Sequence, residues 1–138
     1  MALTKLYFTH HVHENPAQVT EIGEMAILQL EEYFTKKRNS FTLPINPYGT
    51  DFQKKVWKAL LDIPFGYTYS YLKLAQKLGD SNLTRAVGNA NGKNPIPIII
   101  PCHRVIGENG DLTGYSMGLD RKKWLLDFES SIRFPKLF

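Results

Sequence analysis

The residues best equipped for covalent chemistry stand side by side in the middle of the second half of the chain. Cys102 is the single cysteine, and His103 and Arg104 follow it directly. A nucleophilic cysteine reacts as a thiolate, so it needs a neighbouring base or positive charge. Adjacent side chains on a strand point to opposite faces, so Cys102 and His103 can cooperate only in a turn or through a water. Such a triplet supports attack by the thiol with His103 as its base.

The residues alone leave other interpretations of Cys102 open. A lone cysteine is by default an inert, buried packing residue, and it excludes disulfide frameworks and multi-cysteine zinc patterns. His10, His11 and His13 are rival partners for the thiol. Hydrolase chemistry with a Cys-His-Glu or Cys-His-Asp set also remains open. We expect the three N-terminal histidines to be a solvated cluster, and we predict neither a metal nor a cofactor.

Short helices are predicted before the triplet. Residues 50–53 (Thr-Asp-Phe-Gln) form a capping box, which starts a helix that ends at residues 63–66. Ser70 caps a second short helix that stops at Gly79, and Leu83, Ala86, Val87 and Ala90 mark a third, which stops at Gly92. Two short helices joined by a tight turn indicate either a helix-turn-helix or plain packing of two helices.

The segment that leads to Cys102 is apolar and rich in proline. Residues 94–101 (Asn-Pro-Ile-Pro-Ile-Ile-Ile-Pro) predict an extended, buried arm or an edge strand. Beyond Cys102, residues 108–111 predict a turn that closes a hairpin between 104–106 and 112–115. Cys102 is therefore expected where a rigid arm meets a reversal of the chain.

A last helix is predicted over about 120–128, with Trp124, Leu125 and Phe128 facing inward. Arg121, Lys122 and Lys123 fall in its first turn, where cations oppose the helix dipole. The two explanations are long side chains that reach out to solvent and an anion bound nearby. We favour the first, at a cost of a few tenths of a kcal/mol.

The N-terminal part indicates a small lobe. We expect a strand over 3–9, a helix capped by Asn15 with Pro16 as its first residue that runs to about Phe34, and a second strand over 40–45. Pro44, Pro47 and Gly49 place a boundary near residue 47. The predicted fold class is α/β, in the α+β sense, with a lobe at 1–47 and a mainly helical domain at 48–138 that carries the helix-turn-helix and the Pro-Cys-His-Arg-Val loop.

Composition and charge limit the classes of protein. The 138 residues are 43% hydrophobic and 22% charged, which is typical of a globular protein. No apolar run approaches the roughly 18–20 residues of a membrane span, and residues 1–9 show no secretory signal, so we expect no membrane segment and a reducing intracellular location. Residues 52–107 carry eight basic and two acidic side chains. This net charge of +6 indicates a polyanionic partner only weakly, since many enzymes have similar charged faces.

Two stretches of sequence carry a resemblance to a known family. Residues 85–90 (Arg-Ala-Val-Gly-Asn-Ala) and 94–105 (Asn-Pro-Ile-Pro-Ile-Ile-Ile-Pro-Cys-His-Arg-Val) resemble the signature of the O6-alkylguanine-DNA alkyltransferases. Flanking pieces agree, among them 49–53, 63–66, 114–116 and 124–126. The similarity spans roughly 28–129, and its Pro-Cys-His-Arg-Val core is highly specific.

The resemblance implies roles for residues around the thiol. Cys102 would accept the alkyl group from O6 of guanine by in-line displacement, with His103 withdrawing its proton through a water and Glu129 orienting His103. Tyr115 would protonate the departing guanine. The residues implied in substrate binding are Ser116 at O6, Pro97 as a wall of the alkyl pocket, Asn94 as a tie between helix and arm, and Val105.

On the DNA side, the resemblance implies that the damaged nucleotide rotates out of the duplex. Arg85 would fill the vacated stack, and Tyr71 would press on the phosphate of the rotated nucleotide. Ala86, Gly88 and Ala90 would let their helix approach the minor groove closely. The expected partner is double-stranded DNA that carries O6-alkylguanine, and O4-alkylthymine as a further lesion, bound by a monomer in the cytoplasm, or in the nucleus of a eukaryote.

The expected function is thus DNA repair by one irreversible transfer to Cys102. The alternative is a sensor that binds alkylated DNA without efficient transfer, although the non-catalytic relatives replace the cysteine that this chain keeps. The sequence also departs from the family: the N-terminal lobe is short and lacks the cysteines of a zinc site, and Met117 is bulky where many relatives have a small residue.

Overall fold

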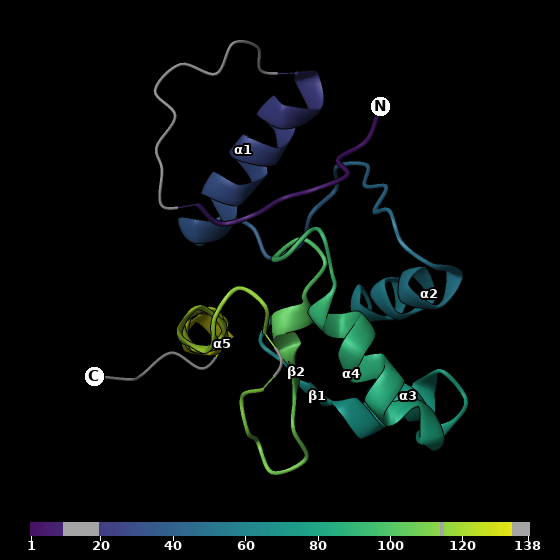
Figure 1. The fold of residues 1–138 in the computed structure, drawn as a ribbon. Coiled ribbons are helices and arrows are strands. Elements are labelled where there is room, and N and C mark those ends of the chain that lie inside the picture. Colours follow the sequence, from purple (N-terminus) through teal and green to yellow (C-terminus); the bar gives the residue numbers. More distant parts are fainter. Residues whose placement is uncertain (10–19, 114, 134–138) are drawn as a thin grey trace.

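The protein was analysed as a computed structural model, which describes residues 1–9, 20–113 and 115–133. In chain order the elements are α1 (Glu21–Phe34), α2 (Asp51–Leu60), β1 (Tyr69–Ser70), α3 (Tyr71–Lys77), the 3-10 turn η1 (Ser81–Leu83), α4 (Thr84–Gly92), the 3-10 turn η2 (Cys102–Arg104), β2 (Val105–Ile106) and α5 (Leu119–Arg133). Figure 1 shows α5 on one side, α2, α3 and α4 on the other, and the two strands between them. This mixture of helices with a small sheet confirms the predicted fold class.

The helices of the second half begin and pack as their sequence predicts. Thr50 and Gln53 form the capping box of α2, and Ser70 caps α3 by accepting a hydrogen bond from a backbone N–H. α4 packs against both α2 and α3. The indole Nε1 of Trp57 in α2 donates to the carbonyl of Ala90 in α4 over 2.8 Å, which anchors α4 to the core.

The predicted hairpin beyond Cys102 is wrong, although its turn is present. Gly107 donates to the Asp111 carbonyl over 2.8 Å, which closes the turn. β2 nevertheless pairs in parallel with β1, with Tyr69 opposite Val105. The reason is that the carbonyls of Val105 and Thr113, which a hairpin would use, accept hydrogen bonds from side chains instead.

The two strands predicted in the N-terminal lobe are also wrong. Among the described residues, the segments 3–9 and 40–45 form only one isolated parallel bridge, between Leu3 and Ile45. Leu6 donates to the Pro95 carbonyl over 2.9 Å, so this segment runs along the arm that leads to the thiol. The predicted helix start at Asn15 lies outside the described residues; α1 begins at Glu21 with Thr20 as its N-cap.

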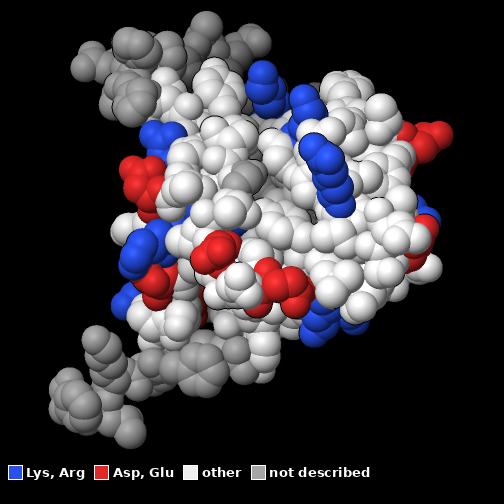
Figure 2. Space-filling model, turned by 60° about the horizontal axis from the view of Figure 1, so that its bottom comes forward, with Lys and Arg blue, Asp and Glu red and all other residues white. Residues whose placement is uncertain are grey.

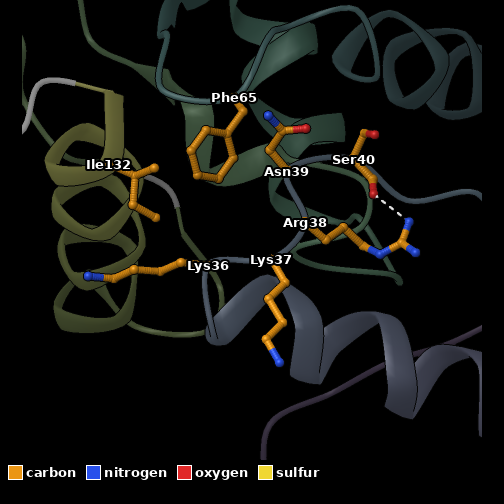
Figure 3. A pocket seen from close by; sticks show the side chains of 7 residues that line it. All are labelled: Lys36, Lys37, Arg38, Asn39, Ser40, Phe65 and Ile132. Carbon is orange, nitrogen blue, oxygen red and sulfur yellow. Dashed lines mark hydrogen bonds between the residues drawn. The ribbon is translucent and has the colours of Figure 1, made fainter.

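α1 ends in a tight left-handed turn. The N–H groups of Lys36 and Lys37 donate to the carbonyls of Tyr33 and Glu32, which is the Schellman pattern. Lys36 occupies the left-handed position, with φ of 67°, where glycine is usual. This turn, Phe65 and Ile132 of α5 line an open surface pocket of about 360 Å³. Figure 3 shows the side chains that surround it.

α5 is longer than predicted, and two of its side chains do not lie on the side that was expected. Leu125 is buried as expected, but Trp124 is 53% exposed and stacks on Phe128 at 5.0 Å. Lys122, expected to reach solvent, is instead fully buried. Among the described residues, no helix combines the length and apolar character that crossing a bilayer requires.

Candidate active site

The segment before the thiol is buried, as predicted, but it is not extended. Ile98 has φ of 72°, and Ile100 donates to the Ile96 carbonyl over 3.0 Å, so the arm makes a tight turn. A β-branched residue in the left-handed region is strained. Asn94 holds the turn from both sides, because its amide donates to the Ile100 carbonyl and its oxygen accepts from the Ile96 N–H.

Cys102 begins the turn η2, so thiol and imidazole leave a tight 3-10 turn rather than a strand. This geometry meets the condition that their cooperation requires. The thiol is 5% exposed, and burial raises its pKa to about 11, although the Asn94 side chain and the Lys122 ammonium act in the opposite direction. In the free protein the thiol therefore needs a base to lose its proton.

Glu129 of α5 is the centre of a buried hydrogen-bond network. One carboxylate oxygen, Oε2, accepts from His103 Nε2 at 2.7 Å, Tyr33 Oη at 2.6 Å and Arg104 Nη2 at 3.0 Å. The other, Oε1, accepts from Arg104 Nε at 2.8 Å and from the Gly66 N–H at 3.4 Å. Burial alone would raise the pKa of this carboxyl, but the hydrogen bonds from His103 and Arg104 lower it to about 2.

This network determines which nitrogen of His103 can act as a base. Because the ionised Glu129 only accepts hydrogen bonds, Nε2 of His103 carries the hydrogen. Nδ1 then carries the lone pair, and it has no hydrogen-bond partner among the described residues. Burial lowers the pKa of the imidazole, Glu129 raises it, and the cations of Arg104 and Lys122 lower it again. A neutral imidazole with a free Nδ1 is the form that can take up a proton.

Lys122 is the buried cation of the site. Its ammonium donates to the carbonyl of Val105 over 2.5 Å and to that of Thr113 over 2.8 Å. Burial lowers the pKa of Lys122 to about 8, with the opposing influence of Cys102. The presence of Lys122 in the basic first turn is thus explained by its two backbone carbonyl partners, rather than by exposure to solvent or by a bound anion.

The other residues implied around the thiol fall into two groups. Asn94, Pro97, Val105 and Tyr115 are buried with Cys102, whereas Ser116 is exposed. The Tyr115 hydroxyl has no hydrogen-bond partner among the described residues. Burial and the neighbouring Cys102 raise the pKa of Tyr115, so its hydroxyl stays protonated at neutral pH.

The residues implied in DNA binding lie mostly on the open side of α4. Arg85 and Ala86 are exposed and line a surface pocket together with Asn82 and Asn89. Ala90 belongs to the core, so its expected contact with a groove is wrong. The Tyr71 hydroxyl donates to the Thr113 carbonyl over 2.8 Å, and a Cβ on Gly88 would meet the Tyr71 ring at 3.6 Å.

The basic side chains do not form one continuous patch on the face shown in Figure 2. Lysines, arginines and acidic side chains all occur there, and broad uncharged areas separate them. On this face, therefore, charge alone does not mark a binding surface. The exposed side chains of α4 are the stronger indication of where DNA binds.

Three residues of the site were not found from the sequence. Tyr33 donates to Glu129 across 96 positions of sequence, Asn91 donates to the Cys102 carbonyl over 3.3 Å, and Lys122 ties β2 to the loop at Thr113. Tyr33 and Asn91 stand at positions where helical spacing predicts only packing. A polar group at a core position was the available signal, because a buried polar group needs a partner.

Comparison with known proteins agrees with this geometry. The model of the family described as "6-O-methylguanine DNA methyltransferase, DNA binding domain" matches residues 51–131. A methylated-DNA–protein-cysteine methyltransferase of Methanosarcina barkeri is 57% identical over 106 residues, which are 77% of this chain and 67% of that protein. The chain belongs to the 6-O-methylguanine DNA methyltransferase family. The matched range contains η2 and nearly all of α5, and so most of the methyltransferase site described above.

Solved methyltransferase structures extend the likeness beyond the matched range. A variant of Mycobacterium tuberculosis OGT is 43% identical, with a TM-score of 0.84 over 99% of this chain and 85% of its own. Mycobacterium tuberculosis OGT in complex with DNA is 51% identical, with a TM-score of 0.76 over 79% of this chain and 66% of its own. The methyltransferase fold therefore includes the N-terminal part that carries Tyr33.

Proposed function

We propose that this protein repairs DNA by transferring the alkyl group of O6-alkylguanine irreversibly to Cys102. The observation that carries the proposal is the buried set in which Glu129 orients His103 beside Cys102 on one turn. Membership of the methyltransferase family supports the same reaction. O4-alkylthymine is a second substrate of the same chemistry.

The chemistry follows from the roles of the side chains. The Cys102 thiol passes its proton to Nδ1 of His103 through a water, and the sulfur attacks the alkyl carbon. A carbon–sulfur bond forms, the bond between carbon and O6 breaks, and its electron pair stays on the guanine. Tyr115 gives a proton to the departing base and regains one from the His103 imidazolium. The products are guanine and a stable thioether, so each molecule reacts once.

We assign DNA recognition to α3 and α4 as a helix-turn-helix that enters the minor groove. Arg85 is exposed at the start of α4, as a side chain that fills a vacated base stack must be. Tyr71 lies next to Gly88, and its hydroxyl reaches the Thr113 carbonyl in the segment between β2 and α5. Rotation of the nucleotide out of the duplex costs a few kcal/mol, which these contacts offset.

The remaining parts of the proposal concern assembly and organisation. We assign the reaction to a monomer with an N-terminal lobe at 1–47 and a DNA-binding, alkyl-accepting domain at 48–138. Ser116 binds near O6, and Pro97 and Val105 line the pocket that Asn94 shapes. The reaction takes place where the DNA is, in the cytoplasm or in the nucleus of a eukaryote.

The test is mass spectrometry of the protein after incubation with a duplex that contains O6-methylguanine. We expect one added methyl group, located on Cys102 by peptide mapping, in a one-to-one burst that then stops. Cys102→Ser is the control and should remain unmodified. An unmodified wild-type protein that still shifts the duplex on a gel would favour the sensor, and repeated turnover of a small ester would favour a hydrolase.

A further inference from the structure

Tyr33 is the one residue of the Glu129 network that comes from the N-terminal helix. It lies in the last turn of α1, is fully buried, and donates its hydroxyl hydrogen to Glu129 Oε2 over 2.6 Å. The reaction described above assigns it no part. A tyrosine in a core usually packs through its ring, so the short hydrogen bond of Tyr33 to the carboxylate that orients His103 requires an explanation.

The Tyr33 hydroxyl and the His103 imidazole share the same oxygen. Oε2 accepts from His103 Nε2 at 2.7 Å, and Arg104 Nη2 is its third donor at 3.0 Å. Every added donor spreads the negative charge of the carboxylate. The less charge remains on Oε2, the less an imidazolium at His103 gains from its neighbour.

The surroundings hold the hydroxyl in place and keep it protonated. Four aromatic rings lie around that of Tyr33, at centroid distances of 5.0 to 6.0 Å: Phe34, Phe41, Phe65 and Phe128. Burial raises the pKa of Tyr33 far above neutrality, and the charge of Glu129 raises it further. The hydroxyl is therefore a permanent donor and cannot replace His103 as an acid or base.

We propose that Tyr33 is a positioning residue that holds the shared Glu129 oxygen and keeps His103 in its neutral, proton-accepting form. The proposal rests on the alkyl transfer proposed above. It makes α1, whose residues lie outside the DNA-binding region matched by the family model, part of the device that controls the base. The expected consequence is that alkyl transfer stays active at lower pH than it would without this hydroxyl.

The charged and titratable groups around His103 give the sign of the effect. Glu129 favours the imidazolium, whereas Arg104 and Lys122 oppose it, and Cys102 adjoins it in the chain. Removing the Tyr33 hydroxyl leaves more charge on Glu129 and raises the pKa of His103. On acidification, His103 then becomes protonated at a higher pH than in the wild type, and the neutral form that can accept a proton is lost earlier.

Tyr33→Phe tests this, because it removes one oxygen atom and keeps the ring. The rate of methyl transfer from an O6-methylguanine duplex is measured from pH 4 to pH 9 in single-turnover reactions. We expect the midpoint of the acid limb to rise by about half a pH unit. One pH unit below the wild-type midpoint, the variant should then react roughly threefold more slowly than the wild type, each rate being taken as a fraction of its own plateau. The proposal is judged on the pH at the midpoint of the acid limb, and not on the maximal rate at the plateau.

Phe41→Leu is the matched control. It disturbs the packing around Tyr33, with the ring of Phe41 centred 5.6 Å away, but leaves the hydroxyl bonded to Glu129. We expect this variant to lose stability without moving the acid limb. An unchanged midpoint in Tyr33→Phe, or an equal shift in both variants, overturns the proposal.

A second measurement keeps this test separate from that of the proposed function. Nitrogen NMR titration gives the pKa of His103 directly, with His103→Gln used to assign its signal. If the wild-type protein transfers no methyl group, the proposed function fails, yet Tyr33→Phe should still raise the pKa of His103. If transfer occurs and this pKa does not rise, the role of Tyr33 fails by itself.

Discussion

Replacement of Glu129 by glutamine should cost the fold about 3 kcal/mol at neutral pH. The carboxylate is 1% exposed, and its pKa is near 2 against an ordinary value of 4.5. Since one pKa unit corresponds to about 1.4 kcal/mol, the ionised form contributes about 3 kcal/mol of stability. Removal of one partner from a buried ion pair costs about 3–5 kcal/mol, here because Arg104 keeps its charge and loses the carboxylate. The cost derived from the pKa shift and the cost expected for breaking a buried ion pair therefore agree.

The dependence on pH gives the sharper assay. A carboxyl group whose pKa is lowered by folding stabilises the protein above its unfolded pKa, and this contribution is lost as the pH falls toward the folded pKa. Urea unfolding of wild type and Glu129→Gln should therefore differ by about 3 kcal/mol at pH 7. At pH 3 about 2 kcal/mol of that difference should be gone, because the wild-type carboxyl is then protonated in the unfolded chain and ionised in the folded one.

Asp127→Asn on the same helix is the control. Asp127 pairs with Lys123 at 2.6 Å, but both side chains are about two-thirds exposed. An exposed pair four residues apart contributes at most about 0.5 kcal/mol. A difference between wild type and Glu129→Gln that is below 1 kcal/mol at pH 7, or that does not change with pH, would refute the reasoning.

Three further predictions concern the thiol, the DNA and the end of α1. Cys102→Ser should abolish methyl transfer and retain the gel shift of the lesion duplex; if both are lost, the assigned division of roles is wrong. Arg85→Ala should slow repair in the duplex much more than reaction with free O6-benzylguanine, because its exposed side chain acts only when a base leaves the stack; comparison of the two rates checks this. Lys36→Gly should raise stability in urea by about 1 kcal/mol, since it relieves a left-handed residue. Lys37 does not have a left-handed backbone, so Lys37→Gly relieves no strain and should lower the stability.

The elements around the site could be predicted where a local signal defines them. The capping box at Thr50, the cap at Ser70 and the stops at Gly79 and Gly92 depend on residues a few positions apart, and the helices they delimit are present. The strands could not be predicted in the same way. β2 pairs with β1 rather than with the segment that follows it, and the side chain of Lys122 occupies the carbonyls of Val105 and Thr113 that a hairpin would use.

The site itself was predictable as a set of residue types but not as a network. The triplet at Cys102 and its resemblance to a known family implied the base and its orienting carboxylate. Nothing local connects Tyr33 to Glu129, and a cation in a first helical turn normally indicates solvent rather than burial. Both contacts depend on how α1 and α5 approach η2, which periodicity does not determine.

The cost of burying charges explains why these distant residues are needed. A carboxylate and a guanidinium taken out of water each lose several kcal/mol of hydration, which only well-placed partners offset. Glu129 therefore requires its five hydrogen bonds, and they come from α1, η2 and the loop at Gly66. Once these partners are assembled, His103 has one orientation and one tautomer before any DNA arrives. A base fixed in advance needs no reorganisation at the moment of reaction, which suits a protein that must succeed in its single transfer.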